Sequence, residues 1–354
     1  MRNGFSKRLF QYAIGALLVG LTLWWLVARR ADEAKIIADS RFLMDTLVTI
    51  KAWGDEAEQV QGLLDAAFGE IERLEGVMSS ERRDSEVSRI NEGASGAWIT
   101  MSADVASVLG RALFFSRLSD GACDVTIGPV MRLWGFSTTT PHVPDKDKIA
   151  AALDLIGADK IAINEGRVRF LKKNMALDLG AIAKGYTVDR AVLVLEEGGA
   201  LGGLVEAGGD LRFFGTKPSG RRWRIALAHP RKAGALIGIG EIPLHSVATS
   251  GDYERFFEAD GKRYHHLLDP RTGYPARRAV SATVWARTCM DADMLSTTLF
   301  VMGPDGIPWI EGLDEVEGWV IYEAEGGLRH RASSGVVGKI SHSSLGRMVG
   351  ANDR

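Results

Sequence analysis

The chain has 354 residues, of which 46% are hydrophobic and 25% charged, with 41 glycines and only two cysteines. This composition is typical of a globular protein and excludes wholesale disorder, a collagen-like repeat, a disulfide scaffold and a four-thiolate metal site. Five of the 43 basic residues and no acidic one precede Ala31; the other 38 basic and 45 acidic residues give a net charge of −7, which argues against a nucleic-acid partner.

Residues 1–30 form the first predicted segment, a membrane anchor. Residues 9–28 carry no charge, and as a helix they are long enough to cross the hydrocarbon core of a bilayer, about 30 Å thick. Basic residues flank this stretch, and Trp24 and Trp25 suit the membrane interface. We expect an uncleaved single-pass helix in the inner (cytoplasmic) membrane, with the body of the chain on the periplasmic, extracytoplasmic side. The alternatives are a cleaved signal peptide and a buried core helix.

After a predicted linker over residues 31–40, helices and strands alternate without a parallel βαβ period. Apolar residues three or four positions apart predict a helix over 60–77 with Asp55 as its N-cap. Similar patterns predict helices over 102–118, 145–156 and 182–197, and a final pair of helices over 292–312. Alternating or short apolar runs predict strands over 46–53, 160–163, 167–171, 203–205, 223–227, 236–239, 279–285 and 319–323. We therefore expect one α+β domain over 41–340 and a tail over 341–354.

Glycine is combined with polar or ionisable residues in four short stretches, 120–129, 178–186, 206–210 and 249–253. Each alone is typical of a tight turn with a capping residue. Four together favour a shared cleft, because glycine lets the backbone approach a phosphate-bearing ligand closely. The candidate ligand-binding residues in these stretches are Asp120, Thr126, Lys184, Gly208, Gly209, Asp210, Thr249, Ser250, Gly251 and Asp252.

Two adjacent histidines, His265 and His266, precede a turn that contains Pro270 and Gly273. Adjacent side chains of a strand point to opposite faces, so at most one of the two serves a site directly. Such a histidine is either a general base or a strand-end residue whose hydrogen bonds are satisfied locally.

Asp293 and Thr297 are four residues apart in a predicted helix and therefore share one face. A carboxylate and a hydroxyl at this spacing suit Mg²⁺ rather than Zn²⁺. The alternative is an aspartate at a helix N-terminus, with a threonine bonded to its own backbone and Asp291 as the cap. Cys289 lies just before this helix, and it either pairs with Cys123 or both are small buried apolar side chains.

In this order, the stretches resemble the ApbE family, flavin transferases that attach FMN from FAD to a Ser or Thr of a target protein. The resemblance begins at residues 42–46, includes 84–91 and 264–273, and covers roughly residues 40–325. It implies an ApbE-type fold with two lobes, mixed or antiparallel sheets and flanking helices. It also implies that FAD lies in a cleft between the lobes.

The resemblance further implies the role of individual residues. His266 is the expected base that activates the acceptor hydroxyl, while Met44 and the turn at 208–210 match flavin-site positions. The expected Mg²⁺ ligands are the Ala181 carbonyl and the side chains of Asp293 and Thr297. The implied acceptor is a flavoprotein of a membrane electron-transfer complex. An Mg²⁺-dependent FAD pyrophosphatase that forms FMN and AMP, and a non-enzymatic flavin carrier, are the alternatives.

The chain departs from the family pattern at three places. Residues 80–83 lack the aromatic side chain that many relatives carry there, Asp45 replaces a glycine, and Glu206 stands where asparagine is common. These changes affect flavin contacts and leave the expected base and metal ligands unchanged.

Overall fold

The computed structural model describes residues 35–342 and 349–350, so the predicted membrane anchor over residues 1–30 lies outside the described part of the chain. Within that part, no helix is long and apolar enough to cross a membrane. Strand β1 (Ile37–Leu43) begins inside the predicted linker, and β19 (Val349–Gly350) lies inside the predicted tail. The sequence of β1 lacks an apolar–polar alternation, because its three polar residues, 39–41, follow one another. The strand is held by antiparallel pairing with β2 (Thr46–Trp53) along all seven of its residues.

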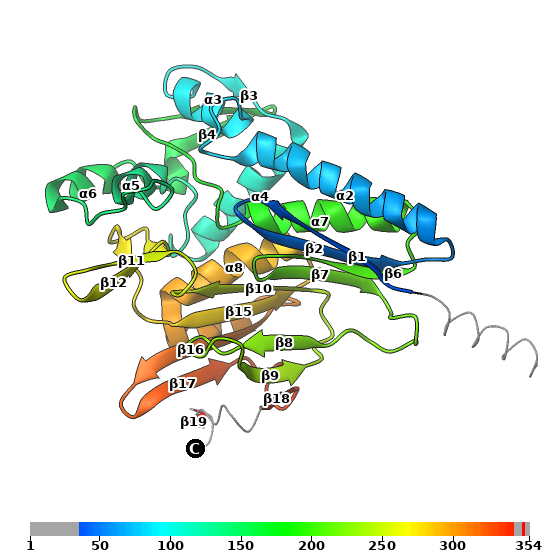
Figure 1. Ribbon diagram of the computed structural model, residues 1–354. Coiled ribbons are helices and arrows are strands. Elements are labelled where there is room, and N and C mark those ends of the chain that lie inside the picture. The colour runs from blue at the N-terminus through cyan, green and yellow to red at the C-terminus, as the bar shows by residue number, and fades with distance from the viewer. Residues whose placement is uncertain (1–34, 343–348, 351–354) are drawn as a thin grey trace, which may run out of the picture.

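A nine-stranded sheet forms the centre of the molecule (Figure 1). All neighbouring strands are antiparallel except β17 and β19. The central strand β15 is buried at all six positions, which means that both faces of the sheet are covered there. From β1, the order is β2 (Thr46–Trp53), β6 (Gly202–Ala207), β7 (Asp210–Gly215), β10 (Ser246–Gly251), β15 (Ser281–Ala286), β16 (Glu317–Ala324), β17 (Gly327–Ala332) and β19.

Three helices cover one face of this sheet: α2 (Ala57–Met78), α7 (Ala183–Glu197) and α8 (Cys289–Met302). Helix α2 packs on β1 and β2, α7 on β6 and β7, and α8 on β10 and β15 (Figure 1). The predicted apolar stripe of α2 is buried as expected. The predicted cap of α2 is wrong, because Glu56 occupies the N-cap position and makes no side-chain cap bond.

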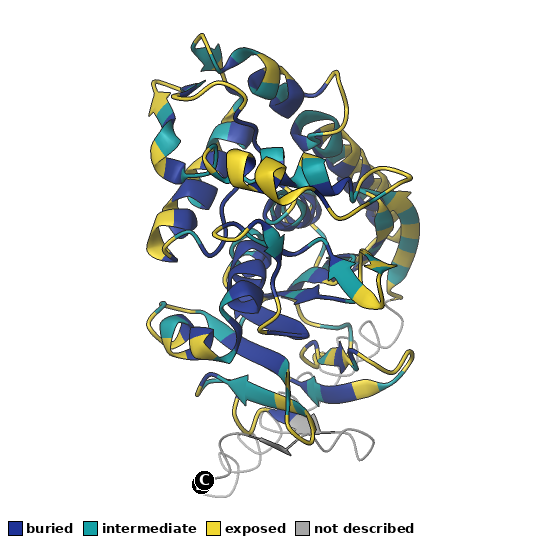
Figure 2. Ribbon diagram, turned by 90° about the vertical axis from the view of Figure 1, so that its left-hand side faces the viewer, coloured by how far each residue is buried: buried dark blue, intermediate teal, exposed yellow. Residues whose placement is uncertain are grey.

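The other face of the sheet is covered near its middle by a three-stranded sheet of β8 (Ile225–Ala228), β9 (Leu236–Gly240) and β18 (Ile340–His342). Leu227 and Ile237 from this small sheet join a buried cluster with Val247, Trp285 and Ile321 of the large one. In Figure 2 the central strands and the helices behind them are largely dark blue, and the exposed segments lie on loops and outer helices. The core is therefore layered, with a helical layer on one side and a strand layer on the other.

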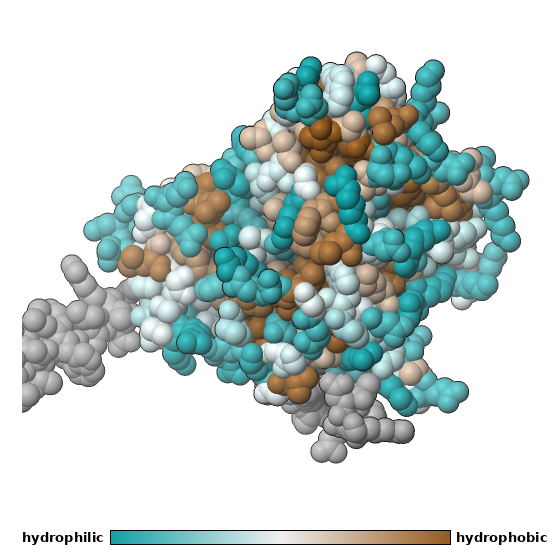
Figure 3. All heavy atoms as spheres, turned by 180° about the vertical axis from the view of Figure 1, so that it is seen from behind, coloured by the Kyte–Doolittle hydropathy of each residue, from teal (hydrophilic) through white to brown (hydrophobic). Residues whose placement is uncertain are grey.

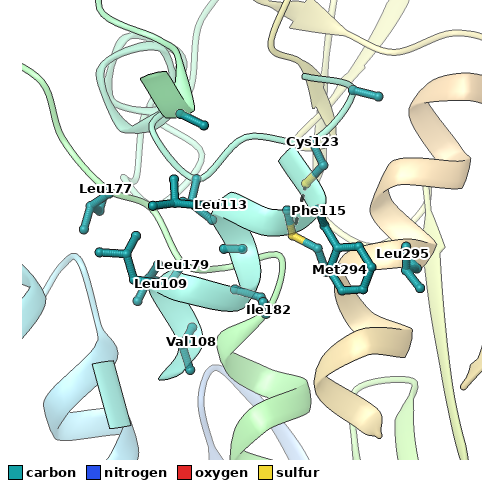
Figure 4. Close-up of a cluster of buried hydrophobic side chains, with 14 of the residues drawn as sticks. Val108, Leu109, Leu113, Phe115, Cys123, Leu177, Leu179, Ile182, Met294 and Leu295 are labelled. Carbon is teal, nitrogen blue, oxygen red and sulfur yellow. Dashed lines mark hydrogen bonds between the residues drawn. The ribbon is translucent and has the colours of Figure 1, made fainter. Parts of the chain in front are cut away.

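Most of the remaining elements form a second, smaller part beside the helical layer (Figure 1), whereas α9 (Ile307–Glu311) packs on β16 of the large sheet. Helix α4 packs its buried residues against α8 and the segment before α7, where Leu109, Leu113 and Phe115 meet Met294 and Leu295 (Figure 4). The elements outside the layers are α3 (Glu86–Gly93), α4 (Ala103–Leu118), α5 (Gly128–Trp134), α6 (Lys146–Leu153), α9 (Ile307–Glu311), β3 (Ile99–Thr100), β4 (Ile161–Asn164), β5 (Arg167–Phe170), β11 (Phe256–Ala259), β12 (Lys262–His265), β13 (Leu268–Asp269) and β14 (Tyr274–Pro275). The expected α+β class is confirmed.

An aromatic cluster ties two hairpins to α5. The ring of Trp134 lies 5.5 Å from Tyr264 and 5.8 Å from Tyr274, and its indole N–H donates to the Gly273 carbonyl at 2.8 Å. Phe257 of β11 stacks on Tyr264 at 5.5 Å. Because β12 ends at His265 and β13 begins at Leu268, this cluster fixes the short segment that carries His266.

Both cysteines are free and buried, so the expected alternative of a disulfide is wrong. The Cys123 sulfur lies 3.6 Å from the Met294 sulfur (Figure 4). Burial raises the pKa of both thiols and keeps them protonated.

On the surface seen from behind, hydrophobic side chains gather toward the centre and upper part and are interrupted by hydrophilic ones (Figure 3).

Candidate active site

Two tight hairpin turns bring the first site residues together. The β1–β2 turn places Met44 and Asp45 at φ 52° and 57°, and the β6–β7 turn places Gly208 and Gly209 at φ 56° and 93°. Two-residue hairpins of this type need positive φ at both positions. A Cβ on Gly208 would lie 2.7 Å from the Thr46 hydroxyl, so glycine is required where the two turns meet.

A cleft of about 590 Å³ opens beside these turns, between the helical layer and the smaller part of the molecule. Its walls contain eleven of the fifteen predicted site residues, which come from stretches up to 250 residues apart in the chain. These eleven are Met44, Ala181, Lys184, Gly208, Asp210, Thr249, Ser250, Gly251, His266, Asp293 and Thr297. The shared cleft expected from the glycine-dense stretches is therefore present.

Two predicted residues of the first glycine-dense stretch lie away from the cleft. Asp120 is exposed in the turn that follows α4, with φ 52°. Thr126 is fully buried, and its hydroxyl donates to Asp124 Oδ1 at 2.6 Å and accepts from the Gly157 N–H at 2.8 Å. Asp124, which lies between these two residues in the sequence, lines the cleft instead.

Gly209 and Asp252 also lie outside the cleft walls. Gly209 is exposed, and its N–H donates to Glu206 Oε1 at 3.0 Å, so the glutamate closes the turn. Asp252 accepts two hydrogen bonds from Arg231, at 2.5 and 2.7 Å, and borders a separate cavity of about 160 Å³ beside His265. Its carboxylate is thus held by Arg231 at this second cavity and does not line the cleft.

The two histidines face different environments, as strand alternation predicts. His265 is buried, with Nε2 2.8 Å from the Ala276 carbonyl oxygen. His266 lines the cleft, and its Nδ1 lies 3.2 Å from the Arg255 carbonyl oxygen, which also accepts from the His266 N–H at 3.0 Å. A carbonyl accepts only, so Nδ1 carries the proton and Nε2 offers a lone pair. Burial lowers the pKa of His266 to about 4, and the ring is neutral at pH 7.

Asp293 and Thr297 point from α8 into the cleft. The Gly185 N–H of α7 donates to Asp293 Oδ2 at 2.9 Å, which leaves the other carboxylate oxygen for the cleft. A Cβ on Gly185 would lie 2.2 Å from the Cys289 carbonyl oxygen, so the two helices meet closely only because residue 185 is glycine. Thr297 does not fold onto its backbone, since its hydroxyl lies 3.1 Å from the Ser250 hydroxyl.

The suggested cap of α8, Asp291, has a different role. Thr288 occupies the N-cap position, and its side chain accepts from the Asp291 N–H at 3.2 Å. The Asp291 carboxylate pairs with Arg111 of α4 through two hydrogen bonds of 2.6 and 2.8 Å. The start of α8 is fixed further by Asp189 of α7, whose oxygens accept from the N–H groups of Cys289 and Met290, both at 2.9 Å.

The floor of the cleft holds two carboxylates and one ammonium group. Lys184 is hydrogen bonded to Asp210, and Asp293 lies close to both. Burial, together with the Asp293 charge, raises the pKa of Asp210 to about 8, and burial also raises that of Asp293. A further cation at this place would favour the charged form of both carboxylates over the protonated one. Among the described residues, no group of three His, Cys, Asp or Glu side chains is suited to a metal, so a cation here would depend on mixed oxygen ligands, which suit Mg²⁺.

Sequence analysis did not single out several charged residues of the cleft, among them Asp178, Arg132 and Arg255. Asp178 begins a glycine-dense stretch, and its Oδ1 accepts from the Gly180 N–H at 2.9 Å; this stretch was its only signal. Arg255 reaches to within 3.5 Å of Asp45 across the cleft mouth. Nothing in the sequence separates these arginines from ordinary exposed ones.

Known proteins are similar to this chain in sequence. The model of the ApbE family matches residues 44–320. The chain is 34% identical over 337 residues to a Haemophilus influenzae protein named FAD:protein FMN transferase, and the match covers 90% of this chain and 95% of that protein.

Solved structures have a similar fold. The crystal structure of the ApbE protein from Thermotoga maritima gives a TM-score of 0.77 at 33% identity, covering 88% of this chain and 98% of that one. The flavin transferase ApbE from Vibrio cholerae gives a TM-score of 0.76 at 33% identity, covering 85% and 98%. The chain therefore belongs to the ApbE family and is a transferase. The expected resemblance and the ApbE-type fold of the body are confirmed.

Proposed function

We propose that this enzyme transfers FMN from FAD to a Ser or Thr hydroxyl of a target protein, releases AMP and depends on Mg²⁺. The observation that carries the proposal is the meeting of His266, Lys184, Asp293 and Thr297 in one cleft, although they come from three separate parts of the chain. The names of the relatives support the flavin substrate. The 590 Å³ volume is in the range of sites for ligands of this size.

His266 is the proposed base. Its Nδ1–H is held by the Arg255 carbonyl, so Nε2 is free to accept the proton of the acceptor hydroxyl. The acceptor oxygen then forms a bond to the FMN phosphorus, the bond from this phosphorus to the AMP oxygen breaks, and AMP leaves. Because the imidazole is neutral at pH 7, no prior deprotonation is needed.

The chain also offers groups that suit a pyrophosphate. Lys184 stands in the first turn of α7, so its ammonium group and the helix N-terminus both present positive potential to the cleft. Asp293, Thr297 and the Ala181 carbonyl are the proposed Mg²⁺ ligands. When bound, Mg²⁺ neutralises negative charge that develops on the phosphate oxygens.

The acceptor and the compartment are part of the proposal. The uncharged stretch at residues 9–28 supports a single-pass anchor in the inner membrane. The body then lies on the extracytoplasmic side, where it meets an acceptor flavoprotein of a membrane electron-transfer complex.

One assay tests the reaction. The full chain in detergent is incubated with FAD, Mg²⁺ and a purified candidate acceptor, and the products are read by mass spectrometry and nucleotide chromatography. We expect the acceptor to gain the mass of FMN less one water and AMP to appear in equal amount. Free FMN with AMP and an unmodified acceptor would identify a pyrophosphatase, and unchanged FAD would identify a carrier; either outcome would overturn the proposal.

In this assay, Asp293→Asn tests the role of the proposed metal site independently of the role of the proposed base. The substitution keeps the shape and removes the carboxylate charge, and we expect turnover to fall at least 100-fold and to lose its dependence on added Mg²⁺. Asp305→Asn, at an exposed position outside the cleft, is the matched control and should transfer FMN at the wild-type rate. Full activity of Asp293→Asn would remove α8 from the proposed metal site.

A further inference from the structure

A chain of three buried hydroxyl groups runs behind the proposed metal site. The Thr297 hydroxyl oxygen lies 3.1 Å from that of Ser250, and the Ser250 oxygen lies 2.8 Å from that of Ser296. Ser296 donates to the backbone carbonyl of Asp293 at 2.9 Å. The three residues are 8%, 8% and 1% exposed in the order Thr297, Ser250 and Ser296, so solvent competes little for these bonds.

The direction of the hydrogen bonds between these three hydroxyl groups follows from counting their protons. Each hydroxyl has one proton, and a carbonyl oxygen can only accept. The proton of Ser296 is used on the Asp293 carbonyl, so the contact between Ser296 and Ser250 must use the proton of Ser250. The contact between Ser250 and Thr297 must then use the proton of Thr297. Three contacts take up three protons, and only one direction satisfies all of them.

The consequence concerns the oxygen of Thr297. Its proton points back to Ser250, so only lone pairs face the cleft. Such an oxygen binds a cation or accepts from a donor, and it cannot donate to a phosphate oxygen. A freely rotating threonine hydroxyl would be able to do either.

We propose that Ser250 and Ser296 are positioning residues that fix the Thr297 hydroxyl as a cation ligand. This inference rests on the proposed Mg²⁺-dependent function and deepens it, because it assigns the orientation of one ligand to two residues that do not themselves touch the ion. The same turn of α8 supplies both ends of the arrangement: the Asp293 carbonyl ends the hydroxyl chain, and the Asp293 carboxylate is the second proposed ligand, held by the Gly185 N–H. Both ligands are thus oriented before any ion arrives.

The expected size of the effect is that of groups that orient metal ligands. Loss of such a partner weakens metal binding by about 10-fold to 100-fold. Ser250→Ala removes the acceptor of the Thr297 proton and should give the larger loss. Ser296→Ala removes a link one step further away, which lets the Ser250 hydroxyl turn, and should give a smaller one.

The test measures metal affinity directly. Mn²⁺ stands in for Mg²⁺ and is titrated into the full chain in detergent, with and without FAD, while free Mn²⁺ is read by electron paramagnetic resonance and Mg²⁺ by competition. The variants are Ser250→Ala, Ser296→Ala and Thr297→Val. The matched control is Thr298→Val, because Thr298 is a fully buried neighbour on α8 whose hydroxyl donates to the Met294 carbonyl at 2.8 Å and takes no part in the chain of three hydroxyl groups. Melting temperatures are measured alongside to separate folding from binding.

We expect metal affinity to fall in the order Thr298→Val, Ser296→Ala, Ser250→Ala and Thr297→Val, with the first equal to the wild type. If the wild type binds the metal and Ser250→Ala binds it equally well, the positioning role is overturned while the proposed function stands. Equal losses in Thr298→Val and Ser250→Ala would overturn it as well, because the effect would then follow from any lost hydroxyl on this layer. A wild-type chain that binds no divalent ion, with or without FAD, would overturn the metal site itself.

Discussion

Gly185→Ala places one methyl group where α7 and α8 meet, beside the proposed metal ligand. The new Cβ would lie 2.2 Å from the Cys289 carbonyl oxygen and 2.8 Å from the Asp293 Cβ. Since real Cβ contacts do not fall below 3.0 Å, the helices must separate by at least 0.8 Å, the difference between 3.0 and 2.2 Å. Overpacking of this kind lowers the free energy of unfolding by about 1–3 kcal/mol.

The same displacement also moves the carboxylate of Asp293, a proposed metal ligand. Separation of the helices lengthens the 2.9 Å bond from the Gly185 N–H to Asp293 Oδ2, which orients the carboxylate. A shift of about 1 Å in a positioned group lowers a reaction rate by about 100-fold. We expect single-turnover FMN transfer by Gly185→Ala to slow by this factor and the apparent Kd for Mg²⁺ to rise.

Gly62→Ala is the control. Gly62 lies inside α2, and nothing stands within 4 Å of an added Cβ. Alanine in an open helical position stabilises by about 0.4–1 kcal/mol, so this variant should unfold at higher urea and keep the wild-type rate. If Gly185→Ala is as stable and as active as the wild type, the close approach of α7 and α8 does not hold Asp293, and the reasoning is wrong.

Three further predictions concern the histidines and the membrane. His266→Ala should slow single-turnover transfer by about 100-fold to 10,000-fold with FAD binding retained, whereas His265→Ala should act through packing; equal losses in rate would contradict the assignment of the base. Burial lowers the pKa of His265 to about 4, from an unfolded value near 6.5, so the unfolded state takes up a proton first and the unfolding free energy should fall by about 3 kcal/mol as the pH drops from 6.5 to 4. His265→Gln should remove this contribution in urea titrations, while that of His266, whose pKa burial also lowers to about 4, remains; an unchanged pH dependence would refute the role of His265. If residues 9–28 are an uncleaved anchor, the mature protein should keep Met1 and stay in the membrane pellet after a high-salt wash; a mature N-terminus near Ala31 would refute this.

Elements with a clear period were predictable from the sequence. The stripe of α2, the helix predicted over 102–118 and the strands predicted over 160–163 and 167–171 lie within a residue or so of where the pattern placed them. Strand β1 was missed because three consecutive polar residues interrupt its apolar pattern and because its conformation depends on pairing with β2. The order of the nine strands was also out of reach, since it depends on which strands pair across long loops.

The candidate site was likewise only partly predictable from the sequence. Glycine-dense stretches located the cleft because backbone that approaches a ligand closely needs glycine, as at Gly208. Within such a stretch, composition does not tell which side chain faces the ligand, and so Asp252 was included although Arg231 holds it at a separate cavity. Arg255 was missed because its contribution to the site is a backbone carbonyl, and every residue has one.

Helix α8 carries its polar residues in the middle of the core. Eleven of its fourteen residues are buried, and Asp293, Ser296, Thr297 and Thr298 stand among leucine, methionine and phenylalanine neighbours that belong to the main hydrophobic cluster. Buried polar groups of this kind stabilise less than apolar side chains of the same volume. The most stable sequence for this helix and the active one are therefore different. Selection for thermostability alone would fill these positions with apolar side chains, and a family member that has lost its activity should be recognisable by an α8 that has become uniformly hydrophobic.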